Sequence, residues 1–403
     1  MQNDALLLAK VSHCCCWIYP TNIYQTKQED AKKMNQAYQI YVHIPFCKAR
    51  CGYCAFSSCT NYNLCQSYFD KLLEQIDQTE VVQKNISTIF IGGGTPSSVD
   101  TIYLDKLFQK LRQKFNLASV TEITVECNPE SVTEQLLLCL KRNNVNRLSF
   151  GLQSTNNQTL KAIGRLHTYE QFVSAVNLAR QFGFTNINAD LILCLPESLE
   201  SFQNSINTVV NLPLTHISVY ALEVHEGSAI ANLCNNFGHT EDDFADMYDF
   251  ACKTLQKHGF ARYEISNFAK VGYMCQHNLG YWQQKRYYAF GSSASGFVQN
   301  TRYDNVQTLQ QYLDTPTDKL LINKQEISPS EQANEFAMLG LRLTDGLSLE
   351  QFKEKFQCDF FQFFPNANRL LNDGFLQIVG QNVLVPQEKF YVVNSILCEL
   401  LNI

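Results

Sequence analysis

Three cysteines stand within eight residues in the stretch YVHIPFCKARCGYCAF, which covers residues 41–56. A disulfide needs two cysteines and a structural zinc site usually needs four ligands, so Cys47, Cys51 and Cys54 suggest a site with an open position. A [4Fe–4S] cluster has four irons and is usually held by four thiolates, so three would leave one iron open. The other interpretations are a zinc loop with a distant fourth ligand, or three cysteines of the core.

The open iron could be chelated by the amine and carboxylate of an amino acid. If that amino acid is S-adenosylmethionine, the reduced cluster can pass an electron to the sulfonium and release a 5′-deoxyadenosyl radical. GGGTP, at residues 92–96, fits this chemistry, because glycines at a strand end let a ligand approach the backbone closely. Such a loop could bind the amino and carboxylate end of the cofactor, although tight turns use the same residues.

The elements that must position these residues follow from the apolar patterns. Repeated strand–helix units imply parallel strands with helices outside, and about six of them favour an open, partial (βα)6 barrel over the closed barrel of eight. The predicted strands cover residues 38–44, 86–94, 122–127, 146–153, 186–196 and 215–222. GGGTP, Glu126, Gln153 and Asp190 stand at strand ends, so we expect them at one mouth of an α/β fold.

The remaining sequence divides around this barrel. Residues 1–33 are polar and irregular, and we expect a poorly ordered extension with Met34 as an alternative start of translation. The predicted barrel covers residues 34–225, and residues 226–325 form a less regular connecting segment. A helix-and-hairpin pattern in residues 326–403 predicts a small α+β domain of winged-helix type.

Composition restricts the class of protein. With 403 residues the chain is expected to fold as more than one domain. The net charge of −6 argues against a large phosphate-binding surface, so nucleic acid is not an expected partner. There is no long apolar run and no secretory signal pattern, so we expect a cytoplasmic protein without stable membrane insertion.

Further motifs follow the cysteines in order between residues 41 and 196: IFIGGGTPS, EITVECNPE, RLSFGLQS, GRLH and NADLILCLP. Together with EFAMLGLRLTDGLSL near the carboxyl terminus, they resemble the radical-SAM family that contains oxygen-independent coproporphyrinogen III oxidase and related heme chaperones. The resemblance covers most of residues 38–403. It implies a [4Fe–4S] cluster on the three cysteines, S-adenosylmethionine as a cofactor and an electron donor for the cluster.

The resemblance also implies roles for particular residues. Tyr41, Gly93 and Glu126 resemble cofactor contacts. Glu126 and Asp190 can accept hydrogen bonds from ribose hydroxyls, and Arg165 can pair with a carboxylate. Taken singly, these residues could also be surface ion pairs or strand-end caps. The positions that resemble the lining of the cofactor or substrate space are Tyr53, Gly94, Thr95, Gln153, Arg165 and Asp190.

Two features choose between the branches of this family. The decarboxylating oxidases resemble Cys-x3-Cys-x2-Cys-x-Cys, but Phe56 stands at the fourth position here and Cys59 is a poor substitute. HNLGYW, which begins at His277, matches a signature of the heme chaperones. We expect His277 to supply an imidazole to heme iron, with Tyr281 and Trp282 packed on the macrocycle. A structural histidine with satisfied hydrogen bonds is the other interpretation.

One departure from the chaperones concerns Ser295, which stands where they usually carry a histidine and so weakens a two-histidine heme model. Cys275 is a competing thiolate ligand. The expected function is a carrier that binds heme and transfers it to an acceptor protein, with no catalytic residue assigned. The alternative is oxygen-independent coproporphyrinogen III oxidase, and nucleic-acid modification is disfavoured by the acidic charge.

Overall fold

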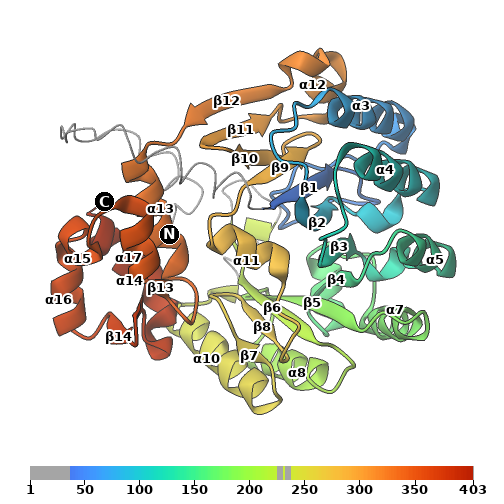
Figure 1. Cartoon of the computed structure of the whole chain (residues 1–403). Coiled ribbons are helices and arrows are strands. Elements are labelled where there is room, and N and C mark those ends of the chain that lie inside the picture. The colour runs from blue at the N-terminus through green and yellow to red at the C-terminus, as the bar shows by residue number, and fades with distance from the viewer. Residues whose placement is uncertain (1–36, 225–229, 232–236, 403) are drawn as a thin grey trace. The chain divides into compact units, whose positions relative to one another are not determined.

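A computed structural model describes residues 37–224, 230–231 and 237–402 of the chain (Figure 1). The described residues form two compact units, one from Tyr38 to Glu326 and the other beginning at Ile327. The extension predicted for residues 1–33 lies outside the described residues.

The larger unit is built on one mixed sheet of twelve strands in the order β12-β11-β10-β9-β1-β2-β3-β4-β5-β6-β8-β7. Strands β1 to β6 are all parallel and lie side by side in chain order. The partial (βα)6 barrel predicted from the sequence is therefore confirmed. These strands are β1 (Tyr38–Ile44), β2 (Ile86–Gly93), β3 (Glu122–Cys127), β4 (Arg147–Gln153), β5 (Asn186–Leu193) and β6 (His216–Ala221).

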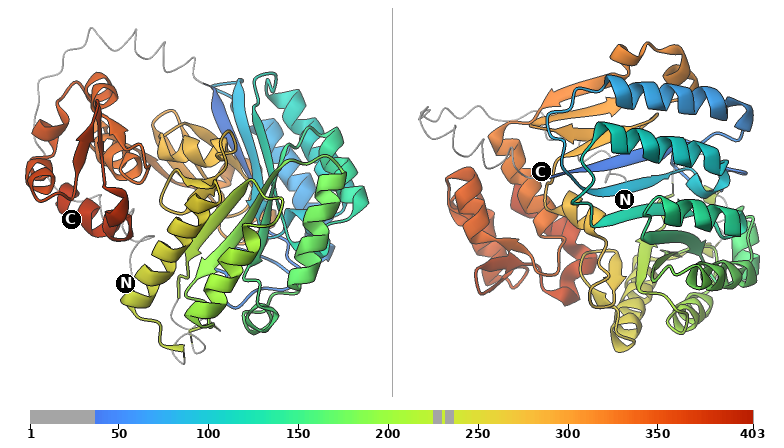
Figure 2. Two further views of the ribbon diagram at one scale, coloured as in Figure 1. Left: turned by 90° about the horizontal axis from the view of Figure 1, so that it is seen from below. Right: turned by 45° about the vertical axis from the view of Figure 1, so that its right-hand side comes forward.

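Helices cover the outer face of this sheet, and Figures 1 and 2 show α3, α4, α5, α7 and α8 ranged along it. Several begin at a side chain that accepts a backbone hydrogen bond, such as Asp100 before α4 and Thr168 before α7. The helices are α3 (Cys65–Gln78), α4 (Thr101–Lys114), α5 (Glu134–Arg142), α6 (Asn157–Ala162), α7 (Tyr169–Gln181), α8 (Leu199–Val209) and α10 (Glu241–Lys257).

Strands β1 to β6 have an apolar outer face and a polar inner face. On β1, Ile40, Val42 and Ile44 are fully buried, and the alternate residue Gln39 donates a 2.8 Å hydrogen bond to Thr88 on β2. Similar cross-strand bonds join other polar residues of the inner face, such as those from Asn188 to Ser149 and from Ser218 to Asn188. The inside of the barrel is therefore lined with groups that can bind a polar ligand.

The strands between Ala261 and Glu326, most of which lie in the segment expected as a connection (226–325), extend the same sheet at both ends. Strand β9 pairs in parallel with β1, and β8 pairs antiparallel with β6. These strands are two to six residues long, too short for an apolar period to reveal them. They are β7 (Ala261–Arg262), β8 (Asn267–Ala269), β9 (Tyr287–Phe290), β10 (Ser295–Val298), β11 (Thr301–Asn305) and β12 (Leu321–Glu326), with helices α11 (Gln276–Trp282) and α12 (Leu309–Asp314).

Helix α11 closes the amino ends of the barrel strands. The Glu122 carboxylate, at the start of β3, accepts hydrogen bonds from the backbone N–H groups of Gln276 (2.9 Å) and His277 (3.1 Å). Gln39, at the start of β1, donates to the His277 carbonyl (3.1 Å). Arg147 is buried in the same layer, and the nearby Cys275 and then Glu122 raise the pKa of Arg147 against the effect of burial. We call this layer the barrel floor.

The smaller unit contains a three-stranded antiparallel sheet in the order β13-β15-β14 with helices around it. Its core includes Phe352, whose ring packs against the rings of Phe336, Phe360 and Phe364. The order helix, strand, helices and hairpin agrees with the predicted winged-helix type. The elements are α13 (Pro329–Gly340), β13 (Leu347–Ser348), α14 (Leu349–Phe356), α15 (Phe360–Phe363), α16 (Asn366–Asn372), β14 (Gln377–Val379), β15 (Asn382–Leu384) and α17 (Val393–Leu401).

The helices in the described part of the chain include none that combines the length and the apolar character needed to cross a bilayer.

Replacing Glu122 with Ala should lower the free energy of unfolding by about 1–3 kcal/mol, because the change leaves the buried N–H groups of Gln276 and His277 without their acceptor. It also removes one of the negative charges near the buried Arg147. Guanidinium unfolding followed by circular dichroism measures the effect. Asp77→Asn, which breaks the exposed ion pair with Lys110, is the control and should change stability much less. Equal losses in the two variants would contradict the importance of the floor.

Candidate functional site

The three motif cysteines lie on a loop between β1 and α3 whose two ends are joined. Cys47 N–H donates to the Cys59 carbonyl (3.0 Å), and Cys59 N–H donates to the Pro45 carbonyl (2.6 Å). Gly52, in the middle of the loop, donates to the Ile163 carbonyl (3.0 Å) and so fastens the loop to the residues after α6. These bonds hold the cysteine loop over the carboxyl end of the barrel.

Each motif sulfur is half-buried, and two of them accept a hydrogen bond. Thr95 Oγ1 donates to Cys47 Sγ (3.4 Å), and Arg165 Nη1 donates to Cys51 Sγ (3.6 Å). Burial raises the pKa of the Cys47 and Cys54 thiols, and the nearby cysteines add to the shift. A bound metal would have to displace those protons, and donors to sulfur would then favour the thiolates.

The described residues contain no set of three His, Cys, Asp or Glu side chains arranged around a single metal ion. Three half-buried thiols on one clamped loop, with a guanidinium and a hydroxyl donating to their sulfurs, have the donor chemistry of an iron–sulfur site.

The glycine loop after β2 lies against the cysteine loop. A side chain at Gly94 would come within 2.8 Å of the Phe46 carbonyl oxygen and 3.0 Å of Cys47 Sγ, so the two loops touch only because Gly94 has none. Gly93 has φ +113°, which favours glycine, and its N–H donates to Glu126 Oε2 (3.0 Å). The predicted closeness of these two motifs is thus present in the structure.

Two buried carboxyl groups, those of Glu126 on β3 and Asp190 on β5, belong to the rim of the barrel. Burial, with a further contribution from Asp190, raises the pKa of Glu126 to about 8. Burial also raises the pKa of Asp190, against the effect of a 2.7 Å hydrogen bond from Asn188. The pKa of Tyr41 is raised by burial and then by Glu126, and the Tyr41 hydroxyl is hydrogen-bonded to His43 Nδ1 (3.1 Å). The rim therefore favours a ligand that donates hydrogen bonds or carries positive charge.

Arg165 supplies the positive charge of the rim. It donates to the Gly151 carbonyl (2.6 Å) and to Asn128 Oδ1 (2.8 Å) as well as to Cys51. Its Nε atom is buried and has no partner among the described residues, which leaves a donor for a bound acceptor. Gln153, at the end of β4, has φ +74° and lies beside it.

Tyr53, between two of the motif cysteines, packs against an apolar group at the same mouth. It lies with Leu222 against a cluster that we call the mouth cluster, formed by Ile163, Ile192, Leu195 and Ile230. Polar and apolar surfaces therefore meet next to the cysteine loop.

His277 lies apart from the other predicted site residues, in the barrel floor, and its expected role as a ligand of heme iron stays a prediction that these contacts do not favour. Its side chain is fully buried in the barrel floor, and burial lowers its pKa to about 3. Nδ1 is bonded to Thr88 Oγ1 (2.8 Å) and Nε2 to the Tyr281 hydroxyl (2.9 Å). Both nitrogens are occupied, as in the structural interpretation of the motif. Cys275 is also fully buried, next to Glu122.

Sequence reasoning missed Asn128, which joins the predicted residues together. Its Nδ2 donates to Thr95 Oγ1 (3.0 Å), while its Oδ1 accepts from Arg165. The signal was its place directly after β3, in VECNP. Ser295 is exposed on β10, and its hydroxyl donates to Asp304 (2.6 Å).

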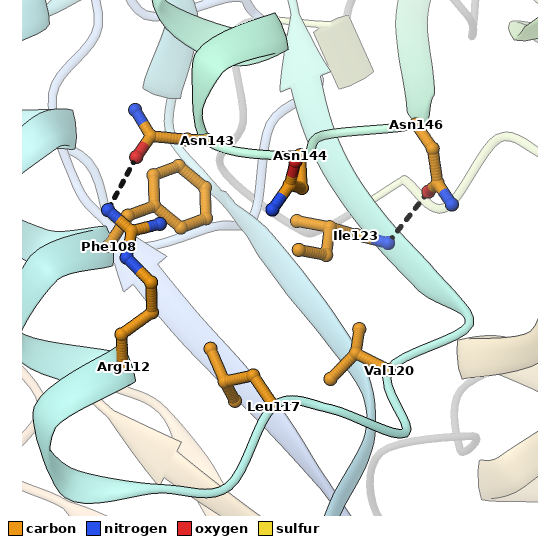
Figure 3. Close-up of a pocket in the computed structure, with 8 residues that line it drawn as sticks. All are labelled: Phe108, Arg112, Leu117, Val120, Ile123, Asn143, Asn144 and Asn146. Carbon is orange, nitrogen blue, oxygen red and sulfur yellow. Dashed lines mark hydrogen bonds between the residues drawn. The ribbon is translucent and has the colours of Figure 1, made fainter.

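A cavity of about 280 Å³ opens at the opposite, amino ends of β3 and β4 (Figure 3). Its polar groups are largely bonded to one another, as in the 2.9 Å contact between Arg112 and Asn143. It is lined by none of the predicted site residues, so it is not the candidate site. The lining residues are Phe108, Arg112, Leu117, Val120, Ile123, Asn143, Asn144 and Asn146.

Comparison with known proteins agrees with this arrangement. Residues 41–209 match the sequence model of the Radical SAM superfamily, and residues 327–390 match that of the HemN C-terminal domain. The structure of coproporphyrinogen III oxidase HemN from Escherichia coli aligns with a TM-score of 0.80 over 94% of each chain, at 21% identity, and so shares the fold. Fold and site together define a radical-SAM protein.

The heme chaperone HemW of Lactococcus lactis is 33% identical over 363 residues, which are 88% of this chain and 95% of that protein. HemW of Bacillus subtilis is 36% identical over 341 residues, 81% of this chain and 89% of that protein. The chain belongs to the HemW family.

Replacing Glu126 with Gln should raise stability in alkaline but not in acidic solution. The folded pKa of about 8 lies above the ordinary value of 4.5, so the protonated carboxyl stabilises the fold at low pH and this contribution is lost as pH rises toward 8. Glutamine has no proton to lose. The melting temperature of the variant relative to wild type, without S-adenosylmethionine, should therefore increase between about pH 4 and pH 9.

Asp190→Asn is the matched variant, because removing its charge lowers the pKa of Glu126 and should reduce the same pH dependence. Parallel pH profiles for Glu126→Gln and wild type would contradict the raised pKa.

Proposed function

We propose that this protein is a heme carrier, which binds heme and transfers it to an acceptor protein. The observation that carries the proposal is the kinship with heme chaperones over 88% of the chain. The site supports it with two different surfaces at one mouth, one polar and one apolar.

Cys47, Cys51 and Cys54 would hold a [4Fe–4S] cluster with one open iron. When bound and reduced, such a cluster supplies an electron for cleavage of the sulfonium of S-adenosylmethionine. The hydroxyl of Thr95 and the guanidinium of Arg165 donate to two of the sulfurs and so favour their thiolate forms. Reduction requires an electron donor as a further partner.

S-adenosylmethionine would lie between the glycine loop and the rim. Glu126 and Asp190 would accept hydrogen bonds from ribose hydroxyls, and Arg165 Nε, which is buried without a partner among the described residues, would donate to the carboxylate of the methionine part. Gly93 and Gly94 keep the loop thin enough for close approach. Tyr41, Tyr53, Thr95 and Gln153 complete the proposed lining.

Heme would occupy the apolar side of the mouth. The ring of Tyr53 and the side chain of Leu222 rest on the mouth cluster, and they offer a surface on which a flat macrocycle can pack. A carrier needs affinity without permanent burial, and an apolar surface at an open mouth meets both needs.

The proposal is tested by anaerobic incubation of the reconstituted protein with heme, and separately with coproporphyrinogen III, in the presence of S-adenosylmethionine and a reductant. We expect heme to bind stoichiometrically and coproporphyrinogen III to release no carbon dioxide, since the fourth motif cysteine is replaced by Phe56. Stoichiometric decarboxylation would instead assign the protein as a coproporphyrinogen III oxidase.

The same preparations test the cluster. Single replacement of Cys47, Cys51 or Cys54 with Ala should abolish the [4Fe–4S] signal in Mössbauer spectra and lower the iron and sulfide content. Cys59→Ala is the matched control, because Cys59 contributes to the loop through its backbone and should leave the cluster intact. A full cluster signal in all three motif variants would refute the assignment.

A further inference from the structure

A protein that carries heme is expected to bind the iron through a side chain, and histidine is the commonest choice. Most of the described histidines are poor candidates because they are buried. Six of the eight histidines lie in the described part of the chain. Four of these six are buried in the larger unit, with ring nitrogens directed to protein partners. They are His43, His167, His216 and His277.

The two remaining described histidines stand at opposite ends of α10. His258 follows the last residue of this helix, and its Nδ1 donates to the Thr254 carbonyl (2.8 Å). His239 precedes Thr240, the residue that caps the first turn. A helix of 17 residues separates them by about 25 Å. Because α10 follows β6, its first turn lies at the mouth of the barrel and its last turn at the floor.

His239 is attached to the mouth cluster. Its Nε2 lies 2.9 Å from the carbonyl oxygen of Leu195, which belongs to that cluster and is fully buried. A carbonyl can only accept, so Nε2 carries the hydrogen in the neutral ring and Nδ1 holds the lone pair. Nδ1 has no hydrogen-bond partner among the described residues, and the side chain is half-buried.

This arrangement is the one in which proteins present an imidazole to a metal. The ring nitrogen that does not bind the metal usually donates to a backbone carbonyl or a carboxylate, which fixes the tautomer and the ring orientation. Here the Leu195 carbonyl has that role. The ring of Phe237 stacks on His239 with centroids 5.9 Å apart and is half exposed, so it adds an aromatic surface beside the ligand.

We propose that His239 is an axial ligand of heme, which binds through Nδ1 while the macrocycle packs on Tyr53 and Leu222 over the mouth cluster. The inference rests on the proposed function of heme carriage and deepens it by naming the ligand. Ligation requires only donation of the Nδ1 lone pair to iron, so no bond within the heme changes. One half-buried histidine at an open mouth allows the heme to leave when an acceptor offers stronger ligation.

The test is an anaerobic titration of the full-length, cluster-reconstituted protein with hemin, followed by absorption spectroscopy. His239→Ala should shift the Soret maximum and weaken heme affinity by about tenfold or more. Free imidazole should restore the wild-type Soret maximum in this variant, which a purely structural role would not allow. His239→Gln keeps a donor for the Leu195 carbonyl and removes the iron ligand, so it should show the same loss with an unchanged melting temperature.

Two variants are matched controls. His258→Gln removes the histidine at the other end of α10 and should bind heme as wild type does. His277→Ala should lower the melting temperature, because it empties a buried site and breaks two hydrogen bonds, but should leave the Soret maximum in place.

Wild-type spectra and affinity in both His239 variants would overturn the assignment while leaving heme carriage standing. The assignment would also be overturned if free imidazole failed to restore the Soret maximum of His239→Ala. The same holds if the Soret shift and the loss of affinity appeared in His225→Gln or Cys194→Ser and not in the His239 variants. If wild-type protein bound no heme at all, heme carriage and the ligand assignment would both be overturned.

Discussion

The buried carboxylate of Glu122 is the interaction on which the closed end of the barrel depends. It accepts hydrogen bonds from the first N–H groups of α11, where a negative charge is also favoured by the helix dipole. The same carboxylate lies beside the charge of the buried Arg147. One side chain thus satisfies the first N–H groups of a helix and also contributes to the electrostatic surroundings of a buried guanidinium.

Buried polar atoms without a partner among the described residues occur at both ends of the barrel, on Gln39 and Arg147 in the floor and on Arg165 at the mouth. The mouth differs in what surrounds such an atom. There Arg165 donates to the sulfur of Cys51, and burial and a neighbouring carboxyl raise the pKa of Glu126. A buried donor without a partner and a carboxyl with a raised pKa are costly unless a ligand completes them, and beside the motif cysteines they indicate the site. The ring of Phe90 contacts the ring of His277 in the floor and that of Tyr41 toward the mouth.

The difference between the floor and the mouth of the barrel changes the role that we assign to the HNLGYW motif. The motif distinguishes the chain within its family, yet its histidine is buried in the floor with both ring nitrogens bonded to protein side chains. A carrier also needs an exchangeable site, and a ring buried in the floor could release heme only by opening the barrel. His239, at the mouth, needs no such opening. Membership of the family therefore does not by itself identify the side chain that binds heme iron. The difference in burial between His277 and His239 favours His239.

The sequence by itself determined the six parallel strands, the cysteine loop and the placement of Glu126, Gln153 and Asp190 on those strands, because each depends on local apolar period or on fixed spacing within a strand–loop unit. Tyr41 and Arg165 were assigned to the rim by resemblance to the family. Only the tertiary structure decided that strands from Ala261 to Glu326 join the same sheet, since their pairing with β1 and β6 comes from distant parts of the chain. The tertiary structure also decided which hydrogen-bond partners surround two of the histidines. His277 meets Thr88 and His239 meets Leu195 across long separations, and no local pattern records whether such a contact buries a ring nitrogen or leaves it free.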